Sequence, residues 1–139
     1  MYTNKLLFHH IGVACEARAF ARGKERQNLD LLGYQAEGDD WVDERLGMRG
    51  QFMVAEEAPR VELVAPHGDK SPVLSWLKQG VKLYHLAFVA SDLWSEIARL
   101  RSQRAKMMLP PTPAVAFNNR HVAFLMLPNQ LLVEVIEKD

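Results

Sequence analysis

The sequence has a single cysteine, Cys15, and this scarcity excludes a fold held together by intramolecular disulfides. It also lacks an excess of charge, because 17 Lys and Arg residues balance 17 Asp and Glu residues. A nucleic-acid or membrane-surface partner needs a basic field, so neither partner is expected. No apolar run approaches membrane-spanning length, and residues 1–10 lack the apolar stretch of a secretory leader. We therefore expect a cytoplasmic protein whose partner is a small molecule.

The 139 residues suit one compact domain, because 48% of them are apolar and 24% are charged. Within them, the same order of strand-like runs and amphipathic segments occurs twice. In the first half we expect a strand at 7–14, a helix over 16–32 that ends at Gly33, and strands at 34–42, 51–55 and 60–65. In the second half we expect a strand at 83–89, a helix over 93–104 with Asp92 as its N-cap, and strands near 106–109, 120–127 and 131–136.

Each half is thus a βαβββ unit, and neither unit can close a hydrophobic core alone. We predict an α+β fold in which two βαβββ modules with mixed sheets form a cup-shaped open barrel, with the helices outside. The modules span about 5–66 and 81–137. A loop and a short helix at 73–79 join them into a single domain, 1–139.

Each half carries a histidine in its first strand and a glutamate in its last strand. These residues are His10 and Glu62 in the first half, and His85 and Glu134 in the second. First and last strands of paired modules meet around a shared concavity, so the four side chains are expected to converge. A carboxylate in an apolar strand is costly to bury without a cation or several donors. A divalent ion is one answer to that cost.

Four segments carry a resemblance to a known family: HHIGVA at 9–14, VELVAP at 61–66, YHLAF at 84–88 and LVEV at 132–135. They resemble the vicinal oxygen chelate superfamily, which contains glyoxalase I, extradiol dioxygenases, and fosfomycin- and bleomycin-resistance proteins. Their motifs are most similar to those of methylmalonyl-CoA epimerases. The resemblance implies that His10, Glu62, His85 and Glu134 bind one divalent metal ion, with Co, Ni, Mn, Fe and Zn all compatible with this ligand set.

The activity implied by the resemblance is removal of a proton alpha to a carbonyl, for example in an acyl-CoA thioester, through a metal-stabilised enolate. The enzyme would be an isomerase, epimerase or lyase in which Glu134 is both metal ligand and catalytic base. Epimerisation needs a second acid/base, and the nearest equivalent here is Gln51, whose amide does not exchange a proton near neutral pH. We expect Gln51, Asn119 and Arg120 to contact the substrate. Arg120 would clamp a carboxylate or phosphate, unless it is a solvated turn residue.

Two alternatives stay open at this point. One is a lyase similar to glyoxalase I, and the other is a non-catalytic binding or resistance protein of the same fold. An extradiol dioxygenase is disfavoured, because Glu62 would add a fourth ligand to a site that needs an open position. A homodimer is compatible with the sequence but is not required. We expect His9, His67 and His121 not to bind metal, and Cys15 to be an inert buried thiol.

Overall fold

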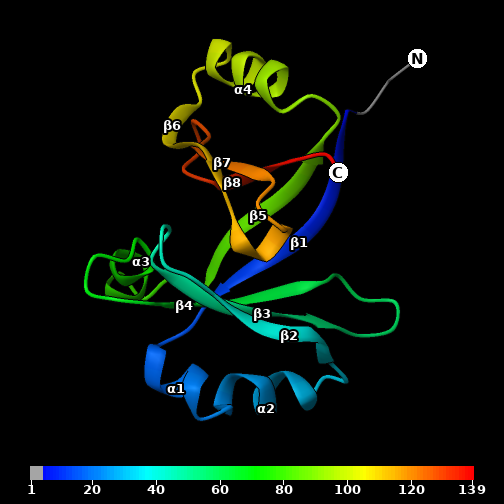
Figure 1. Ribbon diagram of the computed structural model, residues 1–139, viewed down its shortest axis with the longest axis vertical. Coiled ribbons are helices and arrows are strands. Elements are labelled where there is room, and N and C mark those ends of the chain that lie inside the picture. The colour runs from blue at the N-terminus through cyan, green and yellow to red at the C-terminus, as the bar shows by residue number, and fades with distance from the viewer. Residues whose placement is uncertain (1–4) are drawn as a thin grey trace. The chain divides into compact units, whose positions relative to one another are not determined.

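The computed structural model describes residues 5–139, and the chain divides into two compact units. The first unit contains residues 10–84, and the second contains residues 5–9 together with 85–139. Strand β1 (Leu6–Ala14) belongs to both, because its first four residues lie in the second unit and the rest lie in the first. Figure 1 shows the elements of each unit.

The first unit orders its strands β2-β3-β4-β1, and helices α1 and α2 pack against one face of them (Figure 1). Strand β1 runs parallel to β4, whereas β3 is antiparallel to both β2 and β4. After β1, its elements are α1 (Ala17–Ala21), α2 (Lys24–Asp30), β2 (Gln35–Asp43), β3 (Met48–Val54), β4 (Val61–Pro66) and α3 (Val73–Lys78).

The prediction of one continuous helix over 16–32 is wrong, because α1 and α2 are separate short helices. Gly23 lies between them with a φ of +74°, a left-handed conformation that interrupts a right-handed helix. A second left-handed glycine, Gly33 with a φ of +90°, follows α2 where the helix end was predicted. The predicted end of the helical region at Gly33 is thus confirmed, whereas its continuity through Gly23 is not.

Alternation along β4 separates the core of the first unit from its other face. Val61, Leu63 and Ala65 pack in one apolar cluster with Phe20 of α1. Neighbouring residues of a strand point to opposite faces, so Glu62 lies on the face that the helices do not cover. The same alternation places His10 with Glu62, because Val13 of β1 belongs to the helix-side cluster and lies an odd number of residues from His10.

The second unit repeats this plan with the strand order β1-β5-β8-β7-β6. Strand β5 runs parallel to β8, and β7 is antiparallel to both β8 and β6. Its elements are β5 (Leu83–Ala90), α4 (Leu93–Ser102), β6 (Lys106–Pro113), a 3-10 turn η1 (Val115–Phe117), β7 (His121–Met126) and β8 (Leu132–Glu137).

Helix α4 covers one face of these strands (Figure 1). Asp92 caps it as predicted, because its carboxylate accepts a hydrogen bond from the Ser95 backbone N–H at 3.2 Å. Leu93 and Ile97 of the helix pack in one cluster with Val133 and Val135 of β8. Glu134 therefore lies on the opposite face of β8.

Both units thus contain the order strand, helix, three strands, with the same parallel and antiparallel pairings. The predicted α+β fold of two βαβββ modules with mixed sheets is confirmed. That the modules make up a single domain stays a prediction. Within residues 5–139, no helix combines the length and the apolar character that crossing a membrane requires.

Candidate functional site

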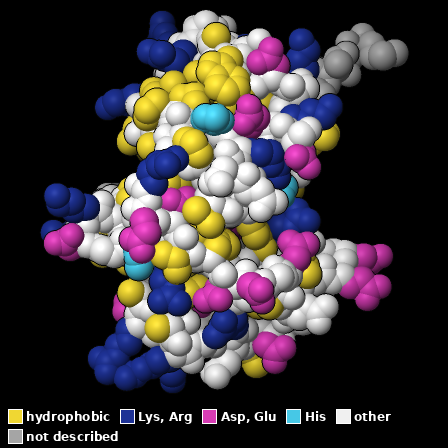
Figure 2. Space-filling model, in the orientation of Figure 1, with side chains coloured by type: hydrophobic (Ala, Val, Ile, Leu, Met, Phe, Trp, Pro, Cys, Tyr) yellow, Lys and Arg dark blue, Asp and Glu magenta, His cyan; other side chains and the backbone are white. Residues whose placement is uncertain are grey.

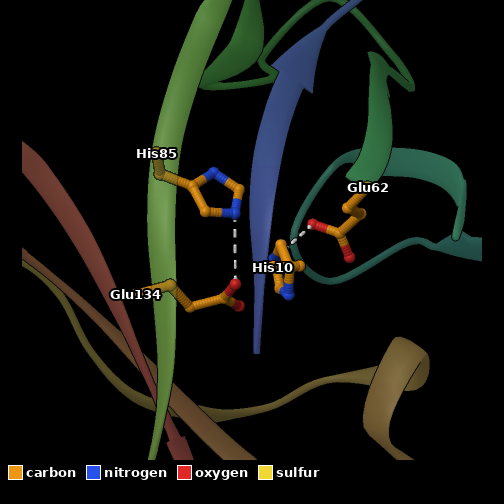
Figure 3. A group of neighbouring side chains, drawn as sticks. All are labelled: His10, Glu62, His85 and Glu134. Atoms are coloured by element: carbon orange, nitrogen blue, oxygen red, sulfur yellow. Dashed lines mark ion pairs between the residues drawn. The ribbon is translucent and has the colours of Figure 1, made fainter. Parts of the chain in front are cut away.

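In the first unit, His10 and Glu62 form a buried pair on the face that the helices leave uncovered. His10 Nε2 lies 3.2 Å from Glu62 Oε1 (Figure 3), and the residues are 0% and 4% exposed. The parallel register aligns Gly12 of β1 with Glu62 of β4. His10 therefore lies two residues before Gly12, the residue of β1 that is aligned with Glu62.

The second unit contains a pair with the same geometry. His85 Nε2 lies 3.2 Å from Glu134 Oε1 (Figure 3), and both residues are 4% exposed. Here the parallel register aligns Ala87 of β5 with Glu134 of β8, so this histidine also precedes the aligned position by two residues. The internal repeat of the sequence thus gives each unit a His–Glu pair with the same distance and the same register offset.

A phenylalanine contacts the imidazole of each pair. Phe52 of β3 packs edge-on against His10 with ring centroids 5.3 Å apart, and Phe124 of β7 does the same to His85 at 5.3 Å. The registers place Phe52 directly across from Glu62, and Phe124 directly across from Glu134. An edge-on ring restricts how far the imidazole can rotate, so it helps to aim Nε2 at the carboxylate.

The two pairs are chemically suited to a metal ion. Each pair places an imidazole nitrogen 3.2 Å from a carboxylate oxygen, and a divalent cation can bind both kinds of atom. A glutamate on a buried strand face is expensive unless its charge is compensated, and in each unit this histidine lies 3.2 Å from the carboxylate. Each unit by itself offers one imidazole nitrogen and one carboxylate that could bind a metal ion.

Gln51 does not share the face of His10 and Glu62. The register aligns it with Leu63 of the helix-side cluster, and directly aligned residues of antiparallel strands point to the same face. Its side-chain oxygen accepts a hydrogen bond from Arg26 of α2 at 3.0 Å, and its nitrogen donates one to the Gly38 carbonyl at 3.1 Å. The predicted substrate contact of Gln51 is therefore not part of the function proposed below.

Asn119 and Arg120 lie just before β7 in the second unit. The Arg120 guanidinium donates to the carbonyl oxygens of Glu137 and Phe117 at 3.0 and 3.2 Å, and it lies 5.7 Å from the centroid of the Phe117 ring. Asn119 is exposed and has a left-handed φ of +67°. Their contact with a substrate stays a prediction, and Arg120 is positioned by internal contacts rather than solvated freely.

The other three histidines, His9, His67 and His121, contact residues outside the two His–Glu pairs. His9 packs edge-on against Phe117, and His67 pairs with Glu44 at 3.0 Å. His121 bonds Glu137 through both its backbone N–H and its ring, which holds the pKa of that carboxyl below its usual range.

Sequence reasoning missed the aromatic residues beside the histidines. The repeat contains a signal for them, because Phe52 precedes Glu62 by the same ten residues as Phe124 precedes Glu134. It also missed Trp41, which lies over Gly50 on the face that carries Glu62.

Comparison with known proteins identifies the family. The sequence model described as the glyoxalase/bleomycin resistance protein/dioxygenase superfamily matches residues 9–124, which is most of the chain. The protein belongs to this superfamily. The match begins just before His10 and contains Glu62 and His85, so three members of the two pairs lie inside the matched region.

Within this superfamily, the chain is similar to methylmalonyl-CoA epimerases. It is 30% identical over 89 residues to the mitochondrial methylmalonyl-CoA epimerase of Dictyostelium discoideum, and the match covers 61% of this chain and 53% of that protein. The chain thus spans about half the length of this curated relative.

Solved structures show the same fold. The methylmalonyl-CoA epimerase of Mycobacterium tuberculosis superposes with a TM-score of 0.78 at 23% identity, covering 100% of this chain and 93% of that one. A Streptomyces coelicolor methylmalonyl-CoA epimerase variant in complex with 2-nitronate-propionyl-CoA superposes with a TM-score of 0.72 at 22% identity, covering 96% and 95%.

Proposed function

We propose that this protein is a metal-dependent enzyme that moves a proton on the carbon alpha to a carbonyl. In the proposal, the two modules close into the predicted cup, and His10, Glu62, His85 and Glu134 bind one divalent ion there. The observation that carries the proposal is the duplicated His–Glu pair, buried in both units with the same 3.2 Å contact and the same register offset.

The donor set fits such an ion. Imidazole nitrogens and carboxylate oxygens suit Co, Ni, Mn, Fe and Zn, and all four residues are buried. Each unit alone offers one nitrogen and one carboxylate, which is a short ligand set for any of these ions. Two such sets together leave about two positions of a six-coordinate ion for a substrate with neighbouring oxygens.

When bound, the ion supplies Lewis-acid stabilisation of the negative charge that develops on the carbonyl oxygen. The protein must supply the base, and Glu134 is the proposed group. A carboxylate has two oxygens, so Glu134 can hold the ion with one oxygen and accept the alpha proton on the other. His85 lies 3.2 Å from this carboxylate, and Phe124 packs edge-on against the His85 ring, so both help to keep the pair oriented.

The structure of the first unit favours a reaction with one protein base. On the face of β3 that carries the His10–Glu62 pair, the residues nearest Glu62 are Phe52, aligned with it, and Gly50, two residues along. Neither residue can exchange a proton, whereas inversion at a carbon needs an acid/base on each side of it. We therefore favour proton exchange on one face, as in an isomerase or lyase, over two-base epimerisation.

Acyl-CoA thioesters are the first substrate class to test. Solved relatives are complexes with methylmalonyl-CoA and with 2-nitronate-propionyl-CoA. A glyoxalase I-like lyase acting on a hemithioacetal is the second candidate, because moving a proton between neighbouring carbons on one face needs only one base. This second candidate is favoured by Phe52 and Gly50, which leave that face of β3 without an acid/base beside Glu62.

Deuterium incorporation tests the proposal whichever product the enzyme forms. Protein reconstituted with Co²⁺ is incubated in deuterium oxide with propionyl-CoA, with the hemithioacetal of methylglyoxal and with a keto acid, and incorporation is followed by mass spectrometry. We expect exchange in one class, with a loss of about a hundredfold or more in Glu134→Gln. Full exchange by Glu134→Gln would overturn the assignment of the base, and a lack of exchange in all three classes would favour a binding protein.

A further inference from the structure

Trp41 lies over Gly50, on the same strand face as Glu62. Trp41 is aligned with Gly50 of β3, and Phe52 of β3 is aligned with Glu62. Aligned residues share a face, and so do Gly50 and Phe52, which are two residues apart on one strand. A Cβ at position 50 would lie 2.7 Å from Cζ2 and 3.2 Å from Cε2 of Trp41, and would also contact the Leu63 carbonyl oxygen. A side chain at position 50 would therefore collide with both the Leu63 backbone and the Trp41 ring, and glycine leaves room for both.

The indole nitrogen of Trp41 is buried without a hydrogen-bond partner among residues 5–139. Nε1 is bonded to Cε2, so the N–H belongs to the edge of the ring that lies over Gly50. A buried donor that is left unsatisfied lowers stability by roughly 1–3 kcal/mol, so this donor must be compensated by another gain. A bound ligand with an acceptor oxygen would compensate it directly.

The strand geometry places this donor relative to the proposed metal ligands. Gly50 and Phe52 are two residues apart on β3, which is about 7 Å along a strand. Trp41 is aligned with Gly50, and Glu62 is aligned with Phe52. The indole therefore lies about 7 Å from Glu62, measured along the strand direction. A substrate whose reacting oxygens reach the metal would therefore need a further acceptor at about this separation.

We propose that Trp41 is a substrate-positioning residue whose indole N–H donates to the first amide carbonyl of an acyl-CoA arm. This inference rests on the proposed function, because it takes the metal centre as the place where the acyl group is held. In an acyl-CoA, the first amide follows the thioester sulfur after a two-carbon spacer, which is compatible with the separation along β3. The neighbouring Phe52 ring gives the spacer an apolar surface.

A pair of small thioesters tests the contact. The 2-nitropropionyl thioester of N-acetylcysteamine retains the first amide, whereas the S-ethyl thioester lacks it, and both are compared with 2-nitronate-propionyl-CoA. Dissociation constants are measured by calorimetry on the Co²⁺-loaded protein. We expect Trp41→Phe to weaken binding of the two amide-containing ligands by about five- to tenfold, and to leave the S-ethyl thioester unchanged. Trp94→Phe, which alters an exposed indole of α4, is the matched control.

A second measurement uses the unaltered protein. Its three indole N–H resonances are assigned by substituting Trp41, Trp76 and Trp94 in turn, and the Trp41 resonance is expected to move when an amide-containing ligand binds. An unmoved Trp41 resonance, or equal weakening of both small thioesters by Trp41→Phe, would overturn the proposed contact. If the unaltered protein binds Co²⁺ but none of these ligands, the acyl-CoA inference fails while the metal centre stands. If Co²⁺ does not bind, the proposed function itself fails.

Discussion

His10 Nε2 lies 3.2 Å from Glu62 Oε1, and the residue of β1 that aligns with this glutamate is two positions further along the strand. His85 and Glu134 repeat both the distance and the offset. Figure 2 shows charged side chains of both signs spread over the visible surface, whereas these four residues are buried. Because a buried carboxylate needs a compensating partner, the two pairs are the strongest functional feature of the described residues.

The two glutamates are expected to differ in function although they match in geometry. Glu62→Gln and Glu134→Gln should each weaken Co²⁺ binding by at least about tenfold, because each removes one charged ligand. At saturating Co²⁺, Glu62→Gln should retain measurable deuterium exchange, whereas Glu134→Gln should not, because only Glu134 is the base. Exchange rates at saturating metal measure this, and equal rates in the two variants would contradict the division of roles.

Leu63 is a sensitive position of the first unit's core. It is 0% exposed and aligned with Gln51 across β3 and β4. Leu63→Ala should reduce the free energy of unfolding by about 3 kcal/mol, because it removes buried methyl groups and leaves a cavity. Leu31→Ala is the matched control, since Leu31 is 83% exposed, and a change below about 0.5 kcal/mol is expected there. Urea unfolding measures both, and similar losses would show that Leu63 is not in a rigid core.

Cys15 should be chemically inert in the folded protein. Burial raises the pKa of its thiol from 9.0 to about 12, with the negative charge of Glu25 adding to the effect. Only the thiolate reacts, so alkylation by iodoacetamide at pH 8 should be roughly a thousandfold slower than in the unfolded chain. Alkylation rates with and without guanidinium measure the ratio, and a native rate close to the unfolded one would mean that the thiol is accessible.

The Asp92 cap should make helix α4 sensitive to acid. Hydrogen bonds from the Ser95 backbone and hydroxyl lower the pKa of Asp92 below 3.8, so the folded state favours the carboxylate. The contribution is present above pH 3.8 and is lost as the pH falls through the lowered pKa. Asp92→Ala should therefore melt at a lower temperature at neutral pH, whereas Asp92→Asn, which also caps, should not. The difference in melting temperature between the unaltered protein and Asp92→Ala should shrink in acid. A difference that stays constant with pH would exclude the cap as its cause.

The sequence predicts that each His–Glu pair lies on one strand face, because strand alternation and the internal repeat are local patterns that burial enforces. The face on which Gln51 lies cannot be predicted in the same way. Strand β3 begins at Met48 rather than at the predicted residue 51, and which face a side chain takes depends on register with the neighbouring strand. A shift of one residue exchanges the two faces, and a single sequence contains little information on that pairing.

Two predicted element boundaries differ from the structure. The amphipathic pattern continues through Gly23, so the break between α1 and α2 was hidden by the apolar periodicity. In the second unit, a strand is predicted near 106–109, but β6 continues through two prolines to Pro113. Strand β6 is an edge strand, where a proline does not remove a required ladder hydrogen bond.

The stoichiometry of metal binding tests the central claim most directly. Co²⁺ is titrated into metal-free protein and followed by its visible absorption and by calorimetry, in the unaltered chain and in variants with His10 or His85 replaced by Ala. The account predicts one ion per chain with nitrogen and oxygen ligands, and a large loss of affinity whichever histidine is replaced. Two independent ions per chain, or affinity that survives loss of either histidine, would contradict a single centre built from both His–Glu pairs.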